Sequence, residues 1–558
     1  MLRVLHWPLL LLLLPTWALA QGPKEPKKEP KPRPPVDCKL AGPQRAAQFS
    51  AEALPGRPLS ERYAEYVGTC GLDDVVALTQ QLVRFKTVSG ELPAAKSPGV
   101  AALGRFLRKW AQAHGFDYRV VGNQDVFELS WGTDAPHLGL LFHADVAPAT
   151  ASEWRHDPFD PQVMEGKLYG RGVSDGKGPL ATALVSLAMA QEMGLKPWKG
   201  RVLVLIGNGE QGGRKGMAHY VQTQPLPTHA VSVDAEYPVV VAQSGFAVLN
   251  LEAPLRAREE KDSGRLVAVD ASAGEGLTLV PASASLELLP AQGTSSEQGL
   301  ALVQKALEAV RRERPSLAAE VKLRLVPGVA AGSRIVLSVR GRTAPSAQPE
   351  KGQNALWDLS VIAGQLPLSE NGLSAMLRTI ARRLEGDHYG ERLGIAGQDL
   401  LMGPLVVAPT LLQVKDGKVS LRLHLHRPRN EEGTEDFHKG LDHAVALITQ
   451  ETDGWVKEGG GRVVGEPYLA NTSGPLVAKL LEVYKLQRGM GEGVKPISFR
   501  GETDARLFPR GVDFGPRLPG EPRLGQAPDE FISLERLALN TRMLAAALQA
   551  LVFSPNAP

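Results

Sequence analysis

Residues 138–178 read LGLLFHADVAPATASEWRHDPFDPQVMEGKLYGRGVSDGKG, and this stretch decides the fold. Its apolar start, residues 138–142, predicts a short buried strand that ends at His143. After a polar loop, the glycine-rich residues 170–178 lead into an Ala/Leu-rich run with helical composition. His143 and Asp175 therefore lie at a strand end and at a helix start. In open α/β sheets, this edge is where sites are built.

Strand-like and helix-like segments alternate on both sides of this stretch. Helical periodicity runs through residues 72–85 and 98–114, and it returns at the end of the chain in residues 534–551. Short apolar runs at 201–206 and 229–233 predict further strands. This alternation indicates an α/β fold class with a mixed, largely parallel sheet.

With 558 residues, the chain is too long for one compact core. Between residues 246 and 465 the pattern changes to strands, long helices and a hairpin whose turn is Asp416-Gly417. We therefore expect an inserted α+β lid domain over 246–465. The α/β domain is then made of two segments, 71–245 and 466–558.

The N-terminus has the features of a secretory signal peptide in residues 1–20. Arg3 precedes a leucine-rich core, and an Ala-Leu-Ala end closes at Ala20. We expect cleavage after Ala20 and an exported protein, periplasmic or extracellular. A membrane anchor is the alternative, although the apolar run is short for a span. Residues 21–37 are rich in Pro and Lys and predict a disordered leader.

The only two cysteines, Cys38 and Cys70, bound an N-terminal segment, residues 38–70. In an exported protein we expect a disulfide between them, and two unpaired thiols are the alternative.

The composition is that of a soluble globular protein, with 43% apolar and 22% charged residues. The formal net charge is +3, but residues 21–35 alone hold five Lys/Arg and two Glu. Together with Arg3, these residues account for the whole excess of positive charge. The folded part thus has no basic surplus for nucleic acid, and we expect no nucleic-acid partner. We also expect no stable membrane anchor after signal cleavage.

Four stretches place imidazole or carboxylate groups after predicted strands or at a helix start. They are His143 with Asp145, Asp175, Glu210, and Asp234. Histidine combined with carboxylates is a ligand set that suits Zn²⁺ or a similar divalent ion. A further carboxylate beside such an ion can accept a proton from water, which indicates metal-assisted hydrolysis.

These groups belong to longer motifs that follow one another along the chain. The motifs are His143-x-Asp145, Trp154-x-x-Asp157-Pro-Phe159, Gly170-Arg-Gly172-x-x-Asp175-x-Lys177-Gly178, the Glu210 turn, and Asp234-x-x-Tyr237-Pro238. In this order they resemble the M20 family of co-catalytic zinc peptidases. The resemblance covers roughly residues 72–551. It is strongest to the dipeptidase branch, similar to bacterial PepV-like and Xaa-His dipeptidases.

The resemblance implies a role for each matching residue. His143, Asp175 and Asp234 fall on the ligands of one metal ion, with Asp175 bridging to a second. Asp145 falls on the carboxylate that orients the metal-binding histidine. Glu210 falls on the general base that activates the metal-bound water. The implied cofactor is Zn²⁺, with Mn²⁺ or Co²⁺ as alternatives.

The resemblance also implies a substrate and a contact to it. The substrate is a small peptide or amide, and Arg427 falls on a lid arginine that binds its carboxylate end. We expect a monomer, because a large lid of the dipeptidase type often serves alone.

Three positions depart from the family pattern. Gln211 stands where the family has a second glutamate, and Gln526 stands where it has its last histidine ligand. Both belong to the second metal, so Asp175 is left as its only strong ligand. In the lid, Pro345 replaces a histidine that reaches the substrate carbonyl. We therefore expect one ion instead of two, and no donor from position 345.

Three hypotheses about function follow. The protein is a mononuclear metal-dependent hydrolase of the M20 type; or it is an impaired pseudopeptidase that binds a peptide or a cell-wall fragment; or it is an exported structural protein on a peptidase fold. Retention of Glu210 favours the hydrolase, and Pro345 favours the pseudopeptidase.

Overall fold

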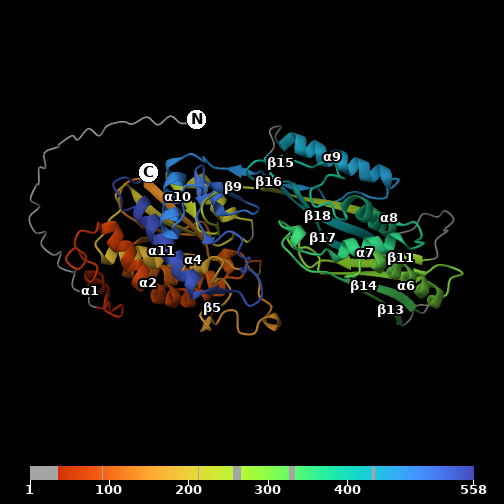
Figure 1. The fold of residues 1–558 in the computed structure, drawn as a ribbon, viewed down its shortest axis with the longest axis horizontal. Helices are drawn as coiled ribbons and strands as arrows, with labels where there is room; N and C mark the ends of the chain where they lie inside the picture. The colour runs from red at the N-terminus through yellow and green to blue at the C-terminus, as the bar shows by residue number, and fades with distance from the viewer. Residues whose placement is uncertain (1–34, 91, 212, 256–265, 326–332, 430–433) are drawn as a thin grey trace, which may run out of the picture.

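The computed structural model describes residues 35–558, except 91, 212, 256–265, 326–332 and 430–433. The expected signal peptide and nearly all of the expected leader lie outside the described residues. Figure 1 shows two lobes side by side, each built on its own nine-stranded sheet. The first lobe contains the start of the described chain and the C-terminus, and the middle of the chain forms the second.

The sheet of the first lobe has a parallel centre with antiparallel strands at its margins. Strands β6, β3, β7 and β23 are neighbours in that order and run parallel, whereas β1 and β2 join antiparallel beside β6. The nine strands are β1 (Asp117–Val121), β2 (Val126–Trp131), β6 (Arg201–Gly207), β3 (Pro136–His143), β7 (His229–Ser232), β23 (Gly511–Asp513), β9 (Val240–Gln243), β21 (Tyr468–Leu469) and β22 (Ile497–Phe499). The α/β class with a mixed sheet is thereby confirmed, and the expected parallel part lies at the centre of the sheet.

Side chains of the central strands alternate between two apolar cores. In β6, Val204 and Ile206 join the large core under the long helices, while Leu203 and Leu205 pack on the other face with α5. Both faces are covered, so the strands read as continuous apolar runs. The helices are α1 (Gly42–Ala47), α2 (Leu59–Val83), α3 (Pro98–Ala113), α4 (Lys177–Glu192), α5 (Lys215–Thr223), α10 (Pro475–Arg488) and α11 (Leu534–Leu551).

The second lobe is an antiparallel sheet with helices packed on it (Figure 1). Its strand order is β13 (Ala318–Leu325), β14 (Ser333–Arg340), β12 (Ser283–Pro290), β11 (Leu266–Ala273), β17 (Val406–Lys415), β18 (Lys418–Arg427), β10 (Gly245–Pro254) and β19 (Lys457–Glu458), and β20 (Val463–Val464) also pairs with β10. The helices are α6 (Ser296–Glu313), α7 (Ala355–Gly364), α8 (Gly372–Thr379) and α9 (Thr434–Glu451).

The chain crosses between the lobes twice. It enters the second lobe at Ser244, between β9 and β10, and it returns between β20 and β21. The predicted hairpin is confirmed: β17 and β18 pair from Lys415 opposite Lys418, and Asp416 and Gly417 both have positive φ. This two-residue turn matches the twist of the strands it joins.

Short elements complete the fold. They are η1 (Ala94–Lys96), η2 (Ala151–Glu153), β4 (Gln162–Met164), β5 (Lys167–Tyr169), β8 (Ala235–Glu236), η3 (Pro349–Lys351), η4 (Ile380–Leu384), β15 (Gln398–Asp399), β16 (Gly403–Pro404), η5 (Asp504–Leu507), β24 (Pro516–Arg517) and β25 (Phe531–Ser533). Within the described ranges, every helix is too short or too polar to cross a bilayer.

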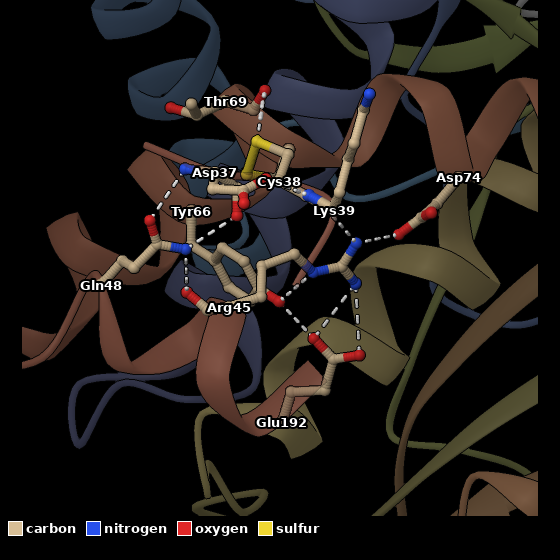
Figure 2. Close-up of a disulfide and its surroundings, with 10 residues drawn as sticks. Asp37, Cys38, Lys39, Arg45, Gln48, Tyr66, Thr69, Asp74 and Glu192 are labelled. Carbon is tan, nitrogen blue, oxygen red and sulfur yellow. Dashed lines mark hydrogen bonds and ion pairs between the residues drawn. A yellow bond between two sulfur atoms is a disulfide. The ribbon is translucent and has the colours of Figure 1, made fainter. Parts of the chain in front are cut away.

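The expected disulfide between Cys38 and Cys70 is present, with the two Cα atoms 5.2 Å apart. It attaches the first described residues to α2, and Figure 2 shows a polar cluster beside it. There Arg45 donates to Asp74 at 2.7 Å and to Tyr66 at 2.8 Å. The N-terminal segment is therefore held to the first lobe by a covalent bond and by hydrogen bonds from Arg45.

Candidate metal centre

Three neighbouring parallel strands direct their carboxyl ends to one edge of the first sheet. His143 is the last residue of β3, Glu210 follows the end of β6, and Asp234 follows the end of β7. Asp175 reaches the same edge from the turn before α4. Residues far apart in the sequence therefore meet where the sheet topology predicts a site.

His143, Asp175 and Asp234 form a compact group of potential ligands. One ligand atom from each lies within 4.8 Å of the others. The Nε2 atom of His143 is 2.9 Å from Asp175 Oδ1 and 3.6 Å from Asp234 Oδ1. His143 is buried, and both aspartate side chains are about 20% exposed. The structure thus brings together the three residues expected to hold one metal.

The imidazole of His143 is oriented by its own loop. Its Nδ1 lies 2.9 Å from the backbone carbonyl oxygen of Asp145, so Nδ1–H donates there and Nε2 faces the two aspartates. The contact differs from the expected one, because the carboxylate of Asp145 is farther from Nδ1, at 3.8 Å. That carboxylate accepts the backbone N–H groups of Glu210 and Gln211 instead, at 3.1 and 2.9 Å. Asp145 therefore couples the ligand histidine to the turn that carries Glu210.

The charges of this group suit one divalent cation. Burial lowers the pKa of His143, but attraction to Asp234 and Asp175 outweighs burial and raises that pKa well above its usual value. Burial raises the pKa of Asp175, whereas the hydrogen bond from His143 lowers it, and the net pKa is about 2. A proton on Nε2 and a metal ion occupy the same place. One nitrogen and two carboxylate donors at this spacing fit Zn²⁺.

The position expected for a second metal contains two neutral amides, those of Gln211 and Gln526. Gln526 donates its amide N–H to Asp175 Oδ2 at 3.0 Å, so the oxygen that would bridge to a second ion already accepts a hydrogen bond. Gln526 thus lies against Asp175, and Gln211 lies in the same cavity. The donor set at that position is one carboxylate and two neutral amides, which bind divalent ions weakly.

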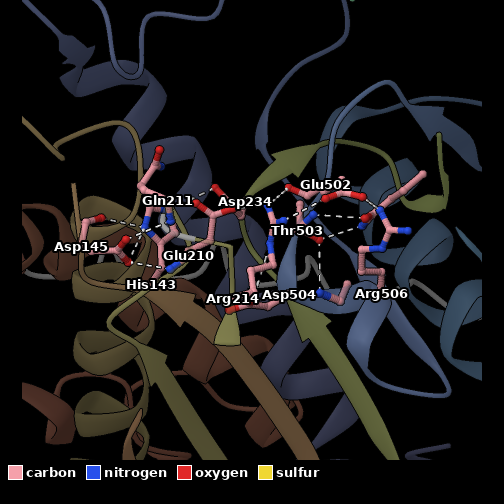
Figure 3. Close-up of polar contacts among 12 residues, drawn as sticks. His143, Asp145, Glu210, Gln211, Arg214, Asp234, Glu502, Thr503, Asp504 and Arg506 are labelled. Carbon is pink, nitrogen blue, oxygen red and sulfur yellow. Dashed lines mark hydrogen bonds and ion pairs between the residues drawn. The ribbon is translucent and has the colours of Figure 1, made fainter. Parts of the chain in front are cut away.

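Glu210, the expected base, lies in an ion pair. Figure 3 shows Arg214 between two groups of carboxylates, with one N–H of its guanidinium donating to Glu210. Burial raises the pKa of Glu210 to about 7, although Arg214 and His143 oppose this rise. A carboxyl group with a pKa near neutrality is suited to accept and release a proton.

Arg214 joins Glu210 to a second set of acidic residues. It bonds the Glu502 carboxylate at 3.0 Å and approaches Asp504 at 3.7 Å. Burial raises the pKa of Asp504 to about 7. The sequence predicted no role for Arg214, Glu502 or Asp504. The spacing of four residues between Glu210 and Arg214 is a signal that could have indicated the ion pair.

The two lid positions lie outside the ligand group. Arg427 is only 2% exposed, pairs with Glu466 and lines a separate cavity within the second lobe. This placement differs from the expected contact with substrate. Pro345 lines a cavity between the lobes. It presents no side-chain donor there, as expected.

The ligand group opens into a cavity of about 110 Å³. Apart from Ser174, Pro516 and Gly525, every lining residue is charged or an amide. These are Asp175, Glu210, Gln211, Asp234, Glu502, Arg517, Arg523 and Gln526. A polar cavity of this kind holds a small charged group and water more readily than an apolar side chain.

Comparisons with known proteins agree with this geometry. A family model described as peptidase family M20/M25/M40 matches residues 139–550. The chain is 27% identical over 488 residues to a putative dipeptidase, YtjP, of Bacillus subtilis (strain 168), covering 86% of this chain and 97% of that protein. It is 28% identical over 485 residues to a Beta-Ala-Xaa dipeptidase of Lactobacillus delbrueckii subsp. lactis, covering 86% of this chain and 95% of that protein.

Solved structures share the fold. Human carnosine dipeptidase 1 superposes with a TM-score of 0.53 at 15% identity, covering 89% of this chain and 99% of that chain. The dipeptidase Dug1p of Saccharomyces cerevisiae gives a TM-score of 0.51 at 12% identity, covering 88% of this chain and 98% of that chain. The chain therefore shares its fold with proteins that it matches over nearly their whole length.

Proposed function

Because the chain belongs to peptidase family M20/M25/M40, whose members are metal-dependent hydrolases of peptide bonds, we propose that it is a mononuclear zinc dipeptidase. The substrate class is supported by the names of the two relatives, both dipeptidases. The observation that carries the single ion is the ligand group of His143, Asp175 and Asp234, beside a second position held by Gln526.

Each residue of the centre has a definite part in the reaction. His143, Asp175 and Asp234 would hold the ion. A bound divalent ion polarises the substrate carbonyl and lowers the pKa of water. Asp145 holds the turn that carries Glu210 at a set distance from His143. Glu210 accepts a proton from the attacking water and later donates it to the leaving amine.

The ion pair with Arg214 must open for Glu210 to take up a proton. Arg214 keeps Glu502 and Asp504 as partners when it releases Glu210, so its charge is never left unpaired. An exchange between partners that are already within 4 Å of the guanidinium costs less than exposing a buried cation.

The two non-enzymatic hypotheses are not favoured. A structural protein does not require three ligands within 4.8 Å, nor a carboxyl group with a pKa of about 7 beside them. Perturbed carboxyl groups in a cavity are typical of catalytic sites.

The function is tested by metal content and turnover on the same preparation. Protein purified without chelators is analysed for metal by mass spectrometry and then assayed on a dipeptide panel with added Zn²⁺, Mn²⁺ or Co²⁺. We expect about one ion per chain, and turnover that Glu210→Gln abolishes while the ion remains bound. Two ions per chain in the wild type contradict the mononuclear site. The absence of turnover with every metal contradicts the peptidase.

We also propose that the protein is exported to the periplasm or the extracellular space and acts as a monomer. The Cys38–Cys70 disulfide supports export, because such bonds persist in oxidising compartments. Mass spectrometry of protein from the native host tests this proposal. A mature chain that begins at Gln21 is the expected result, and an intact Met1 in the cytoplasmic fraction contradicts it.

A further inference from the structure

A second cavity, of about 340 Å³, lies between the two lobes. One wall comes from the first lobe and includes Arg214, Glu502 and Arg523. The opposite wall comes from the second lobe and includes Phe246 of β10 and His426 of β18. Glu502 and Arg523 line this cavity and also the cavity of the ligand group. The two cavities are therefore neighbours that share a wall.

Arg523 stands at this shared wall with its charge available. More than a third of the residue is exposed, and its guanidinium lies over the ring of Phe499 at 4.6 Å from the ring centre. Within the described ranges it has neither a hydrogen bond nor an ion pair. Its charge acts on Asp175 on one side and on His426 on the other.

The other guanidinium groups around the two cavities already have partners. Arg517 lies 3.0 Å from Glu236, Arg214 binds Glu210 and Glu502, and Arg500 donates to the carbonyl oxygen of Ala347 at 3.3 Å. Arg523 thus differs from these three neighbours in having no hydrogen bond or ion pair at all among the described residues. A guanidinium whose plane is held by an aromatic ring presents those donors in the arrangement that matches a carboxylate.

The lid wall has a different chemistry. His424 and His426 are buried, and both bond to the hydroxyl of Ser346, at 2.8 and 3.3 Å. Burial lowers their pKa values to about 4 and 3, so both imidazoles are neutral near pH 7. They do not compete with Arg523 for an anion. With Phe246 beside them they form a largely apolar wall that suits an uncharged side chain.

We propose that Arg523 binds the terminal carboxylate of the substrate and that the cavity between the lobes takes the side chain of the same C-terminal residue. In a dipeptide that carboxylate is one residue beyond the scissile carbonyl. A carbonyl placed at the ligand group therefore brings the carboxylate to the shared wall. This inference rests on the proposed dipeptidase function and makes it specific: the substrate is an unblocked dipeptide with an uncharged C-terminal side chain. The arginine that binds the substrate carboxylate therefore lies on the first lobe, and it is not Arg427.

The test measures binding apart from turnover. In a Glu210→Gln background loaded with Zn²⁺, titration calorimetry compares Ala-Leu with its C-terminal amide, Ala-leucinamide. We expect the acid to bind about 10–100-fold more tightly than the amide, the range of hydrogen bonds to charged groups. Adding Arg523→Gln should remove this preference by weakening the acid about 10–100-fold, with less than a twofold effect on the amide.

Two further variants separate charge from folding. Arg523→Lys should recover part of the acid preference. Arg488→Gln, an exposed arginine at the end of α10 and away from both cavities, should leave it unchanged. Equal binding of acid and amide, an equal loss of both in Arg523→Gln, or no binding of either peptide overturns the inference. Turnover by the protein with Glu210 intact tests the dipeptidase function independently, so either proposal can fail alone.

Discussion

Restoring two ligands should convert the one-ion site into a two-ion site. The variant combines Gln211→Glu with Gln526→His. At present Gln526 donates to Asp175 Oδ2 at 3.0 Å, and the second position has Asp175 as its one charged ligand. The substitutions add a carboxylate and an imidazole, and they free the second oxygen of Asp175 to face an ion.

The size of the effect follows from the number of ligands. Zn²⁺ held by four protein ligands binds with about 10–16 kcal/mol at neutral pH, so one ligand contributes roughly 3 kcal/mol. This is about a hundredfold in affinity, and two added ligands should strengthen the second site by about four powers of ten. Each single substitution should give about half of that gain in free energy.

The assay is equilibrium dialysis against chelator-buffered Zn²⁺, with metal counted by mass spectrometry. The wild type should reach a plateau at one ion per chain, and the double variant should show a second step. Gln365→His, at an exposed glutamine in the second lobe, controls for non-specific binding by an added histidine. A wild type that binds two ions with similar affinity, or a double variant that stays at one, refutes the reasoning about the degenerate position.

Three further predictions concern charge and stability. Arg214→Gln removes a cation that lowers the pKa of Glu210, so the acidic limb of the pH profile of kcat/KM should move upward by roughly 1–3 units. A limb that stays in place contradicts the ion pair. Burial lowers the pKa of His426 to about 3. The imidazole therefore stays neutral in the folded protein at pH values where it binds a proton in the unfolded chain. As a result, the wild type loses stability as pH falls below about 6.5. In urea unfolding, His426→Gln should reduce the stability difference between pH 7.5 and 5 by about 2 kcal/mol, and an unchanged difference contradicts this. Replacing Cys38 and Cys70 by serine opens a loop with a sequence separation of 32, which should lower the free energy of unfolding by roughly 3–4 kcal/mol in urea titration. An equal midpoint shows that packing alone holds the segment.

The ligand group could be predicted because each member follows a local pattern. His143 and Asp234 come directly after apolar runs that can only be buried strands, and Asp175 precedes a helix that is apolar all round. Parallel strands end at one edge of a sheet, so these residues converge whenever the strands pair. The degenerate position was also predictable, since Gln211 and Gln526 occupy motif positions whose neighbours are intact.

Contacts between side chains from unrelated segments could not be predicted. Arg427 pairs with Glu466 across the return of the chain to the first lobe, and nothing in the residues around Arg427 indicates that partner. The role of Asp145 depended on which of its oxygen atoms faces His143, a choice made by the backbone of the loop. In both cases the pairing depends on tertiary packing, which no local pattern encodes.

The sequence by itself determined the α/β class, and it predicted the three candidate ligands, the candidate base and the degenerate second metal position, because strand ends and motif spacing are local properties. Only the tertiary structure decided what surrounds them. It places Arg214 on Glu210, which sets when the base is available, and it leaves Arg523 without an anionic partner among the described residues at the wall shared by two cavities. The physical reason is that a charged group takes its free energy from whichever partners and solvent the completed fold brings within a few ångströms of it.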